Sequence, residues 1–475
     1  MRLYCRSSLW LLLFVALLPA LVTAQEKSAP PNILFLSIDD LRPELGCYGR
    51  PYVQSPNIDQ LAKEGVTFTR AYCQAPVCGA SRASVLTGLR PKGERFASFR
   101  CYAQEDAPGA KSLPQVFKES GYYTISNGKI FHQQDDMDAQ SWTEPAWRPD
   151  ILGRKFLDEA SKQFILRRKD GKKRGPVFEN PDLNDNAYYD GMVADKTIAD
   201  LKKLAAQDQP FFLACGFVRP HLPLYAPKKY WDLYQDVDIQ PAANRFRPKN
   251  APVSLAGSGE IQDFHDRGLK HNSLEFHKQT RRAYYACVSY IDAQVGRIMG
   301  ALDDLGLADN TIVVLWGDHG WHLGEHSFWA KNNLLHNAIQ APLIMRLPGN
   351  EETGMRGQIV ELVDLFPTLC ELASLEAPKN LEGKSFAPIL VDAEHAGKEA
   401  AFCTFKTGQT VITERYTYTR YVWGRKGERM LFDLQQDPSE NQNLAGQEEL
   451  IEVQARLDAL LPRIQAAPKP PAERK

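Results

Sequence analysis

The sequence has almost no excess charge of either sign. Its 57 lysines and arginines nearly balance its 58 aspartates and glutamates, so the formal net charge is −1 at pH 7. Proteins whose main partner is nucleic acid usually carry a basic run or a basic face, and no long basic run is present. The composition therefore argues against nucleic acid as a partner.

Long hydrophobic stretches are also scarce. The main one runs from Leu9 to Val22, after Arg2 and Arg6 and just before Ala24. A positive start, a short apolar run and a small-residue cleavage pattern are typical of a secretory signal peptide, with a membrane anchor as the alternative. We expect residues 1–24 to be a signal peptide and the protein to be exported to the periplasm, the exterior or another secretory compartment. No stable membrane insertion is expected after cleavage.

Cysteine is sparse and irregularly spaced. Nine cysteines are present, and removing Cys5 of the signal peptide and Cys78, discussed below, leaves an odd number. The spacings form neither a dense disulfide framework nor a Cys-x-x-Cys zinc site. Stability must therefore come mainly from a large hydrophobic core.

Continuous apolar runs recur along the chain and alternate with helical patterns. Such runs, without polar alternation, are typical of strands buried on both faces of a sheet. The strand runs are 32–39, 210–217 and 310–318, and the helical patterns are 55–65, 191–206, 280–305 and 363–375. This alternation over about 350 residues predicts an α/β sandwich with a largely parallel central sheet.

The pattern changes after about residue 390. Residues 401–421 are rich in Thr, Tyr, Phe and Val at near-alternate positions, residues 429–434 form a further apolar run, and residues 448–466 have a helical pattern. Alternation of this kind is typical of a half-buried antiparallel sheet. We predict an α/β catalytic domain over 25–390 and a small antiparallel-sheet subdomain with a terminal helix over 391–475.

Polar side chains follow the predicted strands. Asp39 and Asp40 end the first run, His221 follows the second, and Asp318 and His319 end the third. In sheets of this kind ligands bind outside the carboxyl ends of the strands. Adjacent carboxylates there indicate a cation or a shared proton, although a solvated turn is the alternative. An oxygen-rich set of this kind suits Ca²⁺ or Mg²⁺.

A cysteine stands just before a predicted helix in the stretch 75–88. The free N–H groups and dipole of a first helical turn stabilise negative charge beside such a sulfur, and Arg82 adds a cation four residues after Cys78. The ordinary alternative is a small buried side chain. The local sequence predicts an anion pocket with a reactive atom in it.

These residues resemble a known family signature. Cys78-Gly-Ala-Ser-Arg, an apolar pair and Thr-Gly88 resemble the sulfatase signature Cys-x-Pro-x-Arg, with Ala80 at the proline position. The stretch 121–132 is similar to the second sulfatase signature, with Asn127 as a departure, and 431–444 is similar to the closing motif. The stretches 37–45, 220–223 and 318–326 resemble most closely the iduronate-2-sulfatase group of that family.

The resemblance implies an alkaline-phosphatase-like fold and a modified nucleophile. In this family a maturation enzyme oxidises the cysteine to formylglycine, and the hydrated aldehyde attacks sulfur. It also implies one divalent cation, Ca²⁺ or Mg²⁺. The implied ligands are Asp39, Asp40, Cys78, Asp318 and His319. On physical grounds an imidazole is an awkward ligand for a hard cation.

The same resemblance assigns the remaining polar residues. Lys129, Lys331 and Arg82 would offset negative charge on the sulfate and on the oxygens of residue 78. His221 would be the acid for the leaving sugar oxygen and His132 the base for the second hydroxyl, and exchanging these two roles contradicts nothing in the sequence.

The expected function is hydrolysis of a sulfate ester on a sugar, such as a glycosaminoglycan or other sulfated polysaccharide fragment. One alternative is a phosphomonoesterase or phosphodiesterase of the alkaline-phosphatase superfamily. Another is a non-catalytic binder of sulfated glycans, which would follow if Cys78 is never converted. The insertion at 133–190 is expected to lie on the surface, and the insertions at 133–190 and 235–275 are expected to shape the pocket.

Overall fold

A computed structural model describes residues 29–151, 156–167, 173–271, 273–421 and 427–462 of the chain. The predicted signal peptide, 1–24, lies outside the described residues, as does the segment 467–475. No helix in the described ranges is both long and apolar enough to cross a membrane. The eight cysteines in these ranges are all free thiols, and all but Cys47 are buried.

A seven-stranded sheet forms the centre of the molecule, in the order β13-β2-β12-β9-β1-β7-β3. Its strands are β1 (Asn32–Ile38), β2 (Val66–Tyr72), β3 (Tyr123–Gly128), β7 (Phe211–Phe217), β9 (Thr311–Gly317), β12 (Leu343–Arg346) and β13 (Gly354–Glu361). Strand β1 lies between β7 and β9 and is parallel to both, β3 is parallel to β7, and β13 is parallel to β2. Only β12 among these strands is antiparallel to its neighbours. The prediction of a largely parallel sheet is confirmed.

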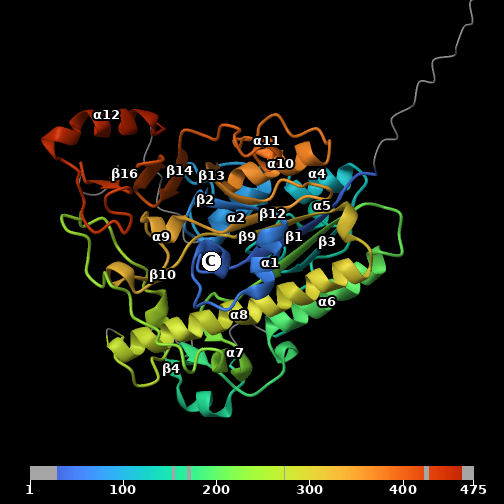
Figure 1. The fold of residues 1–475 in the computed structure, drawn as a ribbon, viewed down its shortest axis with the longest axis horizontal. Helices are drawn as coiled ribbons and strands as arrows, with labels where there is room; N and C mark the ends of the chain where they lie inside the picture. The colour runs from blue at the N-terminus through green and yellow to red at the C-terminus, as the bar shows by residue number, and fades with distance from the viewer. Residues whose placement is uncertain (1–28, 152–155, 168–172, 272, 422–426, 463–475) are drawn as a thin grey trace, which may run out of the picture.

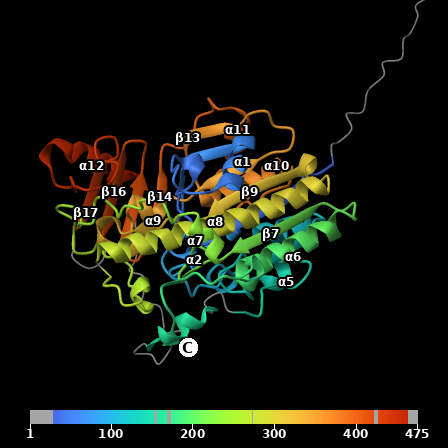
Figure 2. The ribbon, with the colours of Figure 1, turned by 60° about the horizontal axis from the view of Figure 1, so that its bottom comes forward.

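Helices cover both faces of this sheet (Figures 1 and 2). One face packs on α1 (Pro56–Glu64), α6 (Tyr189–Leu204) and α8 (Leu274–Asp304), and the other on α2 (Cys78–Thr87), α4 (Leu113–Glu119) and α10 (Leu365–Leu372). Alternate residues of β1 enter the two cores, with Leu34 and Leu36 on the first side and Ile33 and Phe35 on the second. Burial on both faces explains why β1 has no polar alternation.

The C-terminal part forms a four-stranded antiparallel sheet, as the alternating pattern predicts. Its strands are β14 (Ala401–Phe405), β15 (Gly408–Ile412), β16 (Tyr416–Tyr421) and β17 (Arg429–Asp433). Leu457 of helix α12 (Ile451–Leu460) packs on Tyr418 and Leu431 of this sheet. Figure 1 shows this unit in red beside the larger sandwich. The α-helix begins at Ile451 rather than at the predicted residue 448, because its first turn is a 3₁₀ helix, Glu448–Leu450, and residues 463–466 of the predicted helix lie outside the described residues.

Two further boundaries differ from the predictions. Strand β13 was not predicted. Its last three residues are buried, but burial in the first five is irregular, so the strand contains no continuous apolar run. Helix α8 begins at Leu274 rather than 280, because the Ser273 side chain accepts a hydrogen bond from Phe276 N at 3.1 Å.

The insertion 133–190 is not wholly on the surface. It contains α5 (Asp138–Ser141) and the short strands β4 (Leu166–Arg167), β5 (Lys173–Arg174) and β6 (Phe178–Glu179). Val177 and Phe178 are buried in the core on the α8 side, where β6 pairs with β8 (Leu224–Tyr225). The remaining short helices are α3 (Ala103–Asp106), α7 (Lys228–Asp232), α9 (His336–Ile339) and α11 (Ala387–Val391).

Candidate active site

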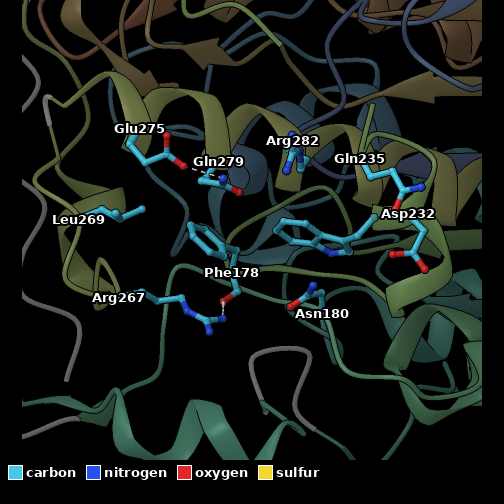
Figure 3. A pocket seen from close by; sticks show the side chains of 10 residues that line it. Phe178, Asn180, Asp232, Gln235, Arg267, Leu269, Glu275, Gln279 and Arg282 are labelled. Atoms are coloured by element: carbon cyan, nitrogen blue, oxygen red, sulfur yellow. Dashed lines mark hydrogen bonds between the residues drawn. The ribbon is translucent and has the colours of Figure 1, made fainter. Parts of the chain in front are cut away.

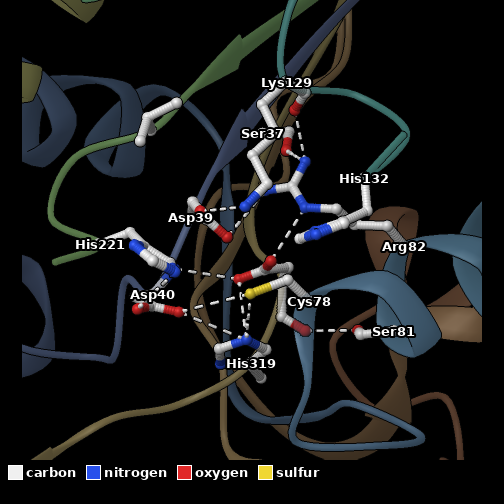
Figure 4. Close-up of polar contacts among 12 residues, drawn as sticks. Ser37, Asp39, Asp40, Cys78, Ser81, Arg82, Lys129, His132, His221 and His319 are labelled. Atoms are coloured by element: carbon white, nitrogen blue, oxygen red, sulfur yellow. Dashed lines mark hydrogen bonds and ion pairs between the residues drawn. The ribbon is translucent and has the colours of Figure 1, made fainter. Parts of the chain in front are cut away.

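The register of the sheet brings three strand ends to one edge. Ile38 of β1 lies opposite Phe217 of β7 and Gly317 of β9, so the residues after these strands share that edge. Asp40, at φ 62°, donates its backbone N–H to Asp318 Oδ1 at 3.0 Å. This hydrogen bond connects the residues that follow β1 and β9. Asp39, Asp40 and Asp318 are all buried (Figure 4).

Cys78 faces this group of carboxylates from the first turn of α2. Its thiol lies 3.2 Å from His319 Nε2 and 3.8 Å from Asp40 Oδ1. Burial, together with the charge of Asp39, raises the pKa of the Cys78 thiol well above its ordinary value. Burial and the charge of Asp39 thus oppose the stabilisation of negative charge that the start of a helix was expected to give this sulfur.

Arg82 lies one turn along α2, with its side chain fully buried. Its Nε donates to Asp318 Oδ2 at 2.9 Å, and Nη1 donates to Ser37 Oγ at 2.8 Å. Nη1 also donates to the backbone oxygens of Lys129 and Ile130. Arg82 therefore connects the ends of the strands through these hydrogen bonds, and its side chain is not exposed in an open pocket.

Two lysines neutralise the paired carboxylates. Lys129, directly after β3, forms an ion pair with Asp39, and Lys331 Nζ lies 2.9 Å from both oxygens of Asp40. Burial would raise the pKa of Asp39, but Lys129 and the neighbouring His221 outweigh it, and the pKa is well below the ordinary value. Burial prevails at Asp40, whose pKa is raised well above its ordinary value despite Lys331.

The two predicted acid–base histidines lie on opposite sides of Asp39. His221 Nδ1 lies 2.6 Å from Leu222 O, which leaves Nε2 facing the site, 3.9 Å from Asp40 Oδ2. His132 packs against Phe99, and its Nδ1 has no hydrogen-bond partner among the described residues. Burial lowers the pKa of both imidazoles well below the ordinary value, with help from Lys331 at His221 and from Lys129 at His132.

Glu260 is a site residue that the sequence did not indicate. It lies in the insertion 235–275, and its carboxylate is 3.2 Å from His221 Nε2 and 3.1 Å from Lys331 Nζ. No motif surrounds it, so only its position in the fold reveals it. The prediction that this insertion contributes to the pocket gains a specific residue here.

Four of the predicted metal ligands lie close together. One ligand atom from each of Asp39, Asp40, Cys78 and His319 falls within 4.8 Å of the others, and all four residues are buried. Asp39 Oδ1 is a buried carboxylate oxygen without a hydrogen-bond partner among the described residues, and it lies 3.5 Å from Arg82 Nη2. Asp318 differs, because its two oxygens already accept hydrogen bonds from Asp40 N and Arg82 Nε. Asp39 and Asp40 supply the carboxylate oxygens that a hard divalent cation takes, whereas the Cys78 sulfur and the His319 nitrogen are softer donors and Asp318 lies at the margin of the set.

Comparisons with known proteins agree with this arrangement. Residues 31–375 match the profile of the sulfatase family, and residues 324–467 match that of the C-terminal region of N-sulphoglucosamine sulphohydrolase. The chain belongs to the sulfatase family. This sulfatase is 35% identical to iduronate 2-sulfatase of Homo sapiens over 396 residues, which cover 75% of this chain and 71% of that protein. It is 32% identical to a sulfatase of Formosa agariphila, with 93% of this chain and 88% of that protein covered.

Solved structures share the fold of this sulfatase. BT4656 in complex with its substrate D-glucosamine-2-N,6-O-disulfate has a TM-score of 0.72 at 23% identity, with 91% of this chain and 97% of that chain covered. The phosphonate monoester hydrolase of Agrobacterium radiobacter has a TM-score of 0.71 at 23% identity, with 90% and 94% covered. The family membership makes the protein a sulfuric ester hydrolase, and these likenesses confirm its alkaline-phosphatase-like fold.

Proposed function

We propose that this sulfatase removes a sulfate ester from a sugar by means of formylglycine at position 78 and one divalent cation. The observation that carries the proposal is the position of Cys78, whose thiol contacts His319 and Asp40 among buried carboxylates and lysines. The raised pKa of the thiol supports a modified nucleophile, because a thiol held in its protonated form is a weak one. The modification needs a maturation enzyme as a partner.

The chain supplies the charges that this reaction requires. A divalent cation held by Asp39, Asp40, residue 78 and His319, with Asp318 beside it, would polarise the sulfate and favour ionisation of the attacking hydroxyl. Lys129 and Lys331, which pair with Asp39 and Asp40, would also offset negative charge on the sulfate oxygens. Arg82 acts through Asp318 and Asp39 and keeps the carboxylates in register.

The two histidines would move the protons. His221 donates to the leaving sugar oxygen in this assignment. Its contact with Glu260 favours the protonated imidazole, against burial and Lys331, which lower the pKa of His221. His132 removes the proton from the second hydroxyl of residue 78, whose collapse expels sulfate and restores the aldehyde. Burial and the nearby Lys129 support a base here, because they keep His132 neutral.

The substrate proposed is a sulfated sugar from a glycosaminoglycan or a related polysaccharide. Relatives that support this class are iduronate 2-sulfatase and an ulvan-active sulfatase of Formosa agariphila. We further propose that residues 1–24 are a signal peptide that directs export, and that the catalytic domain ends near residue 390.

The first experiment is the mass of the peptide that contains residue 78, from protein coexpressed with a maturation enzyme. We expect the formylglycine mass. We also expect sulfate release from members of a panel of sulfated saccharides, tested beside phosphate and phosphonate monoesters. Calcium removal by a chelator should abolish release, and added Ca²⁺ should restore it and raise the melting temperature. An unmodified Cys78 in protein that releases sulfate at full rate would contradict the mechanism, and release of phosphate alone would favour the phosphoesterase alternative.

A further inference from the structure

A second cavity lies apart from the strand edge that holds the catalytic group. Its volume is about 400 Å³, and none of its lining residues belongs to the catalytic group. Four segments build it, namely β6, α7, the loop before α8 and the start of α8 (Figure 3). Cavities of this size accommodate small ligands, so we asked which chemistry its side chains would bind.

Two aromatic rings form one part of the wall. Phe178 and Trp231 have ring centroids 5.7 Å apart at an interplanar angle of 52°. Trp231 is 7% exposed, and its indole Nε1 is a buried donor with no hydrogen-bond partner among the described residues. Buried donors of this kind are nearly always satisfied, so Nε1 points to an acceptor that binds here. The edges of aromatic rings also offer contact area for the C–H face of a pyranose.

The charged groups of the cavity leave cationic donors available. Asp232 is paired with Lys228 at 2.6 Å, and Glu275 Oε1 accepts from Gln279 at 2.7 Å. Arg282 forms no hydrogen bond or ion pair with the described residues, and its Nε is a buried donor without a partner. Lys228 offsets the charge of Asp232, whereas Glu275 bonds only to a neutral amide and keeps its charge. The guanidinium groups of Arg282 and Arg267 outweigh that single carboxylate, which favours an anionic ligand.

A second guanidinium lines the cavity on the side away from α8. Arg267 stacks over the Phe178 ring at 5.4 Å and donates to Phe178 O at 3.3 Å, which holds its side chain in place. Figure 3 shows Gln279 and Arg282 on the α8 side, with Arg267 and Asn180 facing them. Planar guanidinium groups match sulfate and carboxylate oxygens, and the side-chain amides can pair with sugar hydroxyls.

We infer that this cavity is a second, non-catalytic binding site for an acidic saccharide unit carrying sulfate or carboxylate. It would hold one part of a polymeric substrate while another part reaches the catalytic group, and it rests on the proposed function only in the choice of sugar. The cavity and the catalytic group are connected through the chain. Strand β6, which lines the cavity, pairs with β8, and β8 begins three residues after His221.

The test is calorimetric binding of two tetrasaccharides to the full chain carrying Cys78→Ala, which prevents turnover. Heparin tetrasaccharide carries sulfate and carboxylate, whereas hyaluronan tetrasaccharide carries carboxylate only. Arg282→Ala should weaken one binding event at least tenfold, and Trp231→Phe should weaken the same event while keeping an aromatic ring. Loss with both sugars would assign the site to carboxylate, and loss with heparin alone to sulfate.

Lys278→Ala is the matched control, because Lys278 lies on the same helix, is paired with Asp238 at 3.6 Å, and does not line the cavity. It should leave both affinities unchanged. Melting temperatures of all variants within a few degrees of the parent would show that they fold. Binding of both sugars that is unaffected by Arg282→Ala and Trp231→Phe would overturn the inference. This readout needs no turnover, so a failure of the proposed sulfatase reaction would be seen separately.

Discussion

At the scale of single residues, Arg82 decides how the strand ends are held. Its guanidinium contacts Asp318, Ser37 and two backbone carbonyls with no access to solvent. A buried arginine of this kind compensates carboxylates that would otherwise repel one another. The sequence placed Arg82 in an anion pocket, and the structure shows that the anions it contacts are carboxylates of the chain.

Arg82→Ala should therefore lower the free energy of unfolding by about 3–5 kcal/mol, because it leaves Asp318 buried without its ion-pair partner. Arg82→Lys should recover part of this, since it restores the charge but not the five donors. Chemical denaturation measures the effect. Lys111→Ala is the control, since the exposed Lys111–Glu119 pair contributes little. A loss below about 1 kcal/mol in Arg82→Ala would contradict the buttressing role.

At the scale of elements, helix α8 fixes the loop that follows β1. Tyr284 OH donates to Asp40 O at 2.8 Å and accepts from Arg42 N at 3.1 Å. Asp40 has the left-handed φ of 62°, a conformation that costs energy for a non-glycine residue. The hydroxyl of one helical tyrosine thus bridges the two residues that define the turn.

Tyr284→Phe should destabilise the protein by about 1–3 kcal/mol and lower sulfate release several-fold, because it leaves two buried backbone groups unpaired beside a site residue. Tyr290→Phe is the matched control, since Tyr290 OH on the same helix bridges Asp185 O at 2.9 Å and Gly191 N at 2.6 Å. We expect similar losses of stability in the two variants but loss of activity only in Tyr284→Phe. If the Tyr284→Phe and Tyr290→Phe variants have equal activities when they are assayed at the same fraction of folded protein, Tyr284 has no positioning role.

At the scale of the whole molecule, Glu440 joins the C-terminal sheet to the sandwich. It accepts a hydrogen bond from His336 N, at the start of α9, at 2.6 Å, and one from Thr417 of β16 at 3.1 Å. Burial raises the pKa of Glu440 to about 7. The junction therefore contains a carboxyl group whose proton is bound more tightly in the folded state.

Between the unfolded pKa of about 4.3 and the folded pKa, the native state holds a proton that the unfolded state has lost. The free energy of unfolding should thus fall as pH rises from about 4.3 to about 7, by about 4 kcal/mol in total from this group. Glu440→Gln should remove that slope, as melting temperatures from pH 5 to pH 8 would measure. Glu351 is exposed, so the control variant Glu351→Gln should keep the pH dependence of the parent protein. If the Glu440→Gln variant also keeps it, Glu440 is not its source.

The sequence alone determined the α/β order, the antiparallel C-terminal sheet and the residues at the strand ends. These follow from local patterns, because burial on both faces leaves a continuous apolar run and the residue after a parallel strand lies at the carboxyl edge. The resemblance to sulfatases indicated Cys78, Lys129, His221 and Lys331 as site residues. In the structure these residues lie around Asp39 and Asp40.

Only the tertiary structure decided how these residues act on one another. Glu260 has no local signal, since its contacts with His221 and Lys331 come from segments far apart in the chain. The raised pKa of Cys78 depends on burial and on Asp39, neither of which a helix-start pattern contains. The contact of Arg82 with Asp318 likewise joins segments that are far apart in the chain. Through-space electrostatics and burial depend on three-dimensional distances, which a local sequence pattern does not specify.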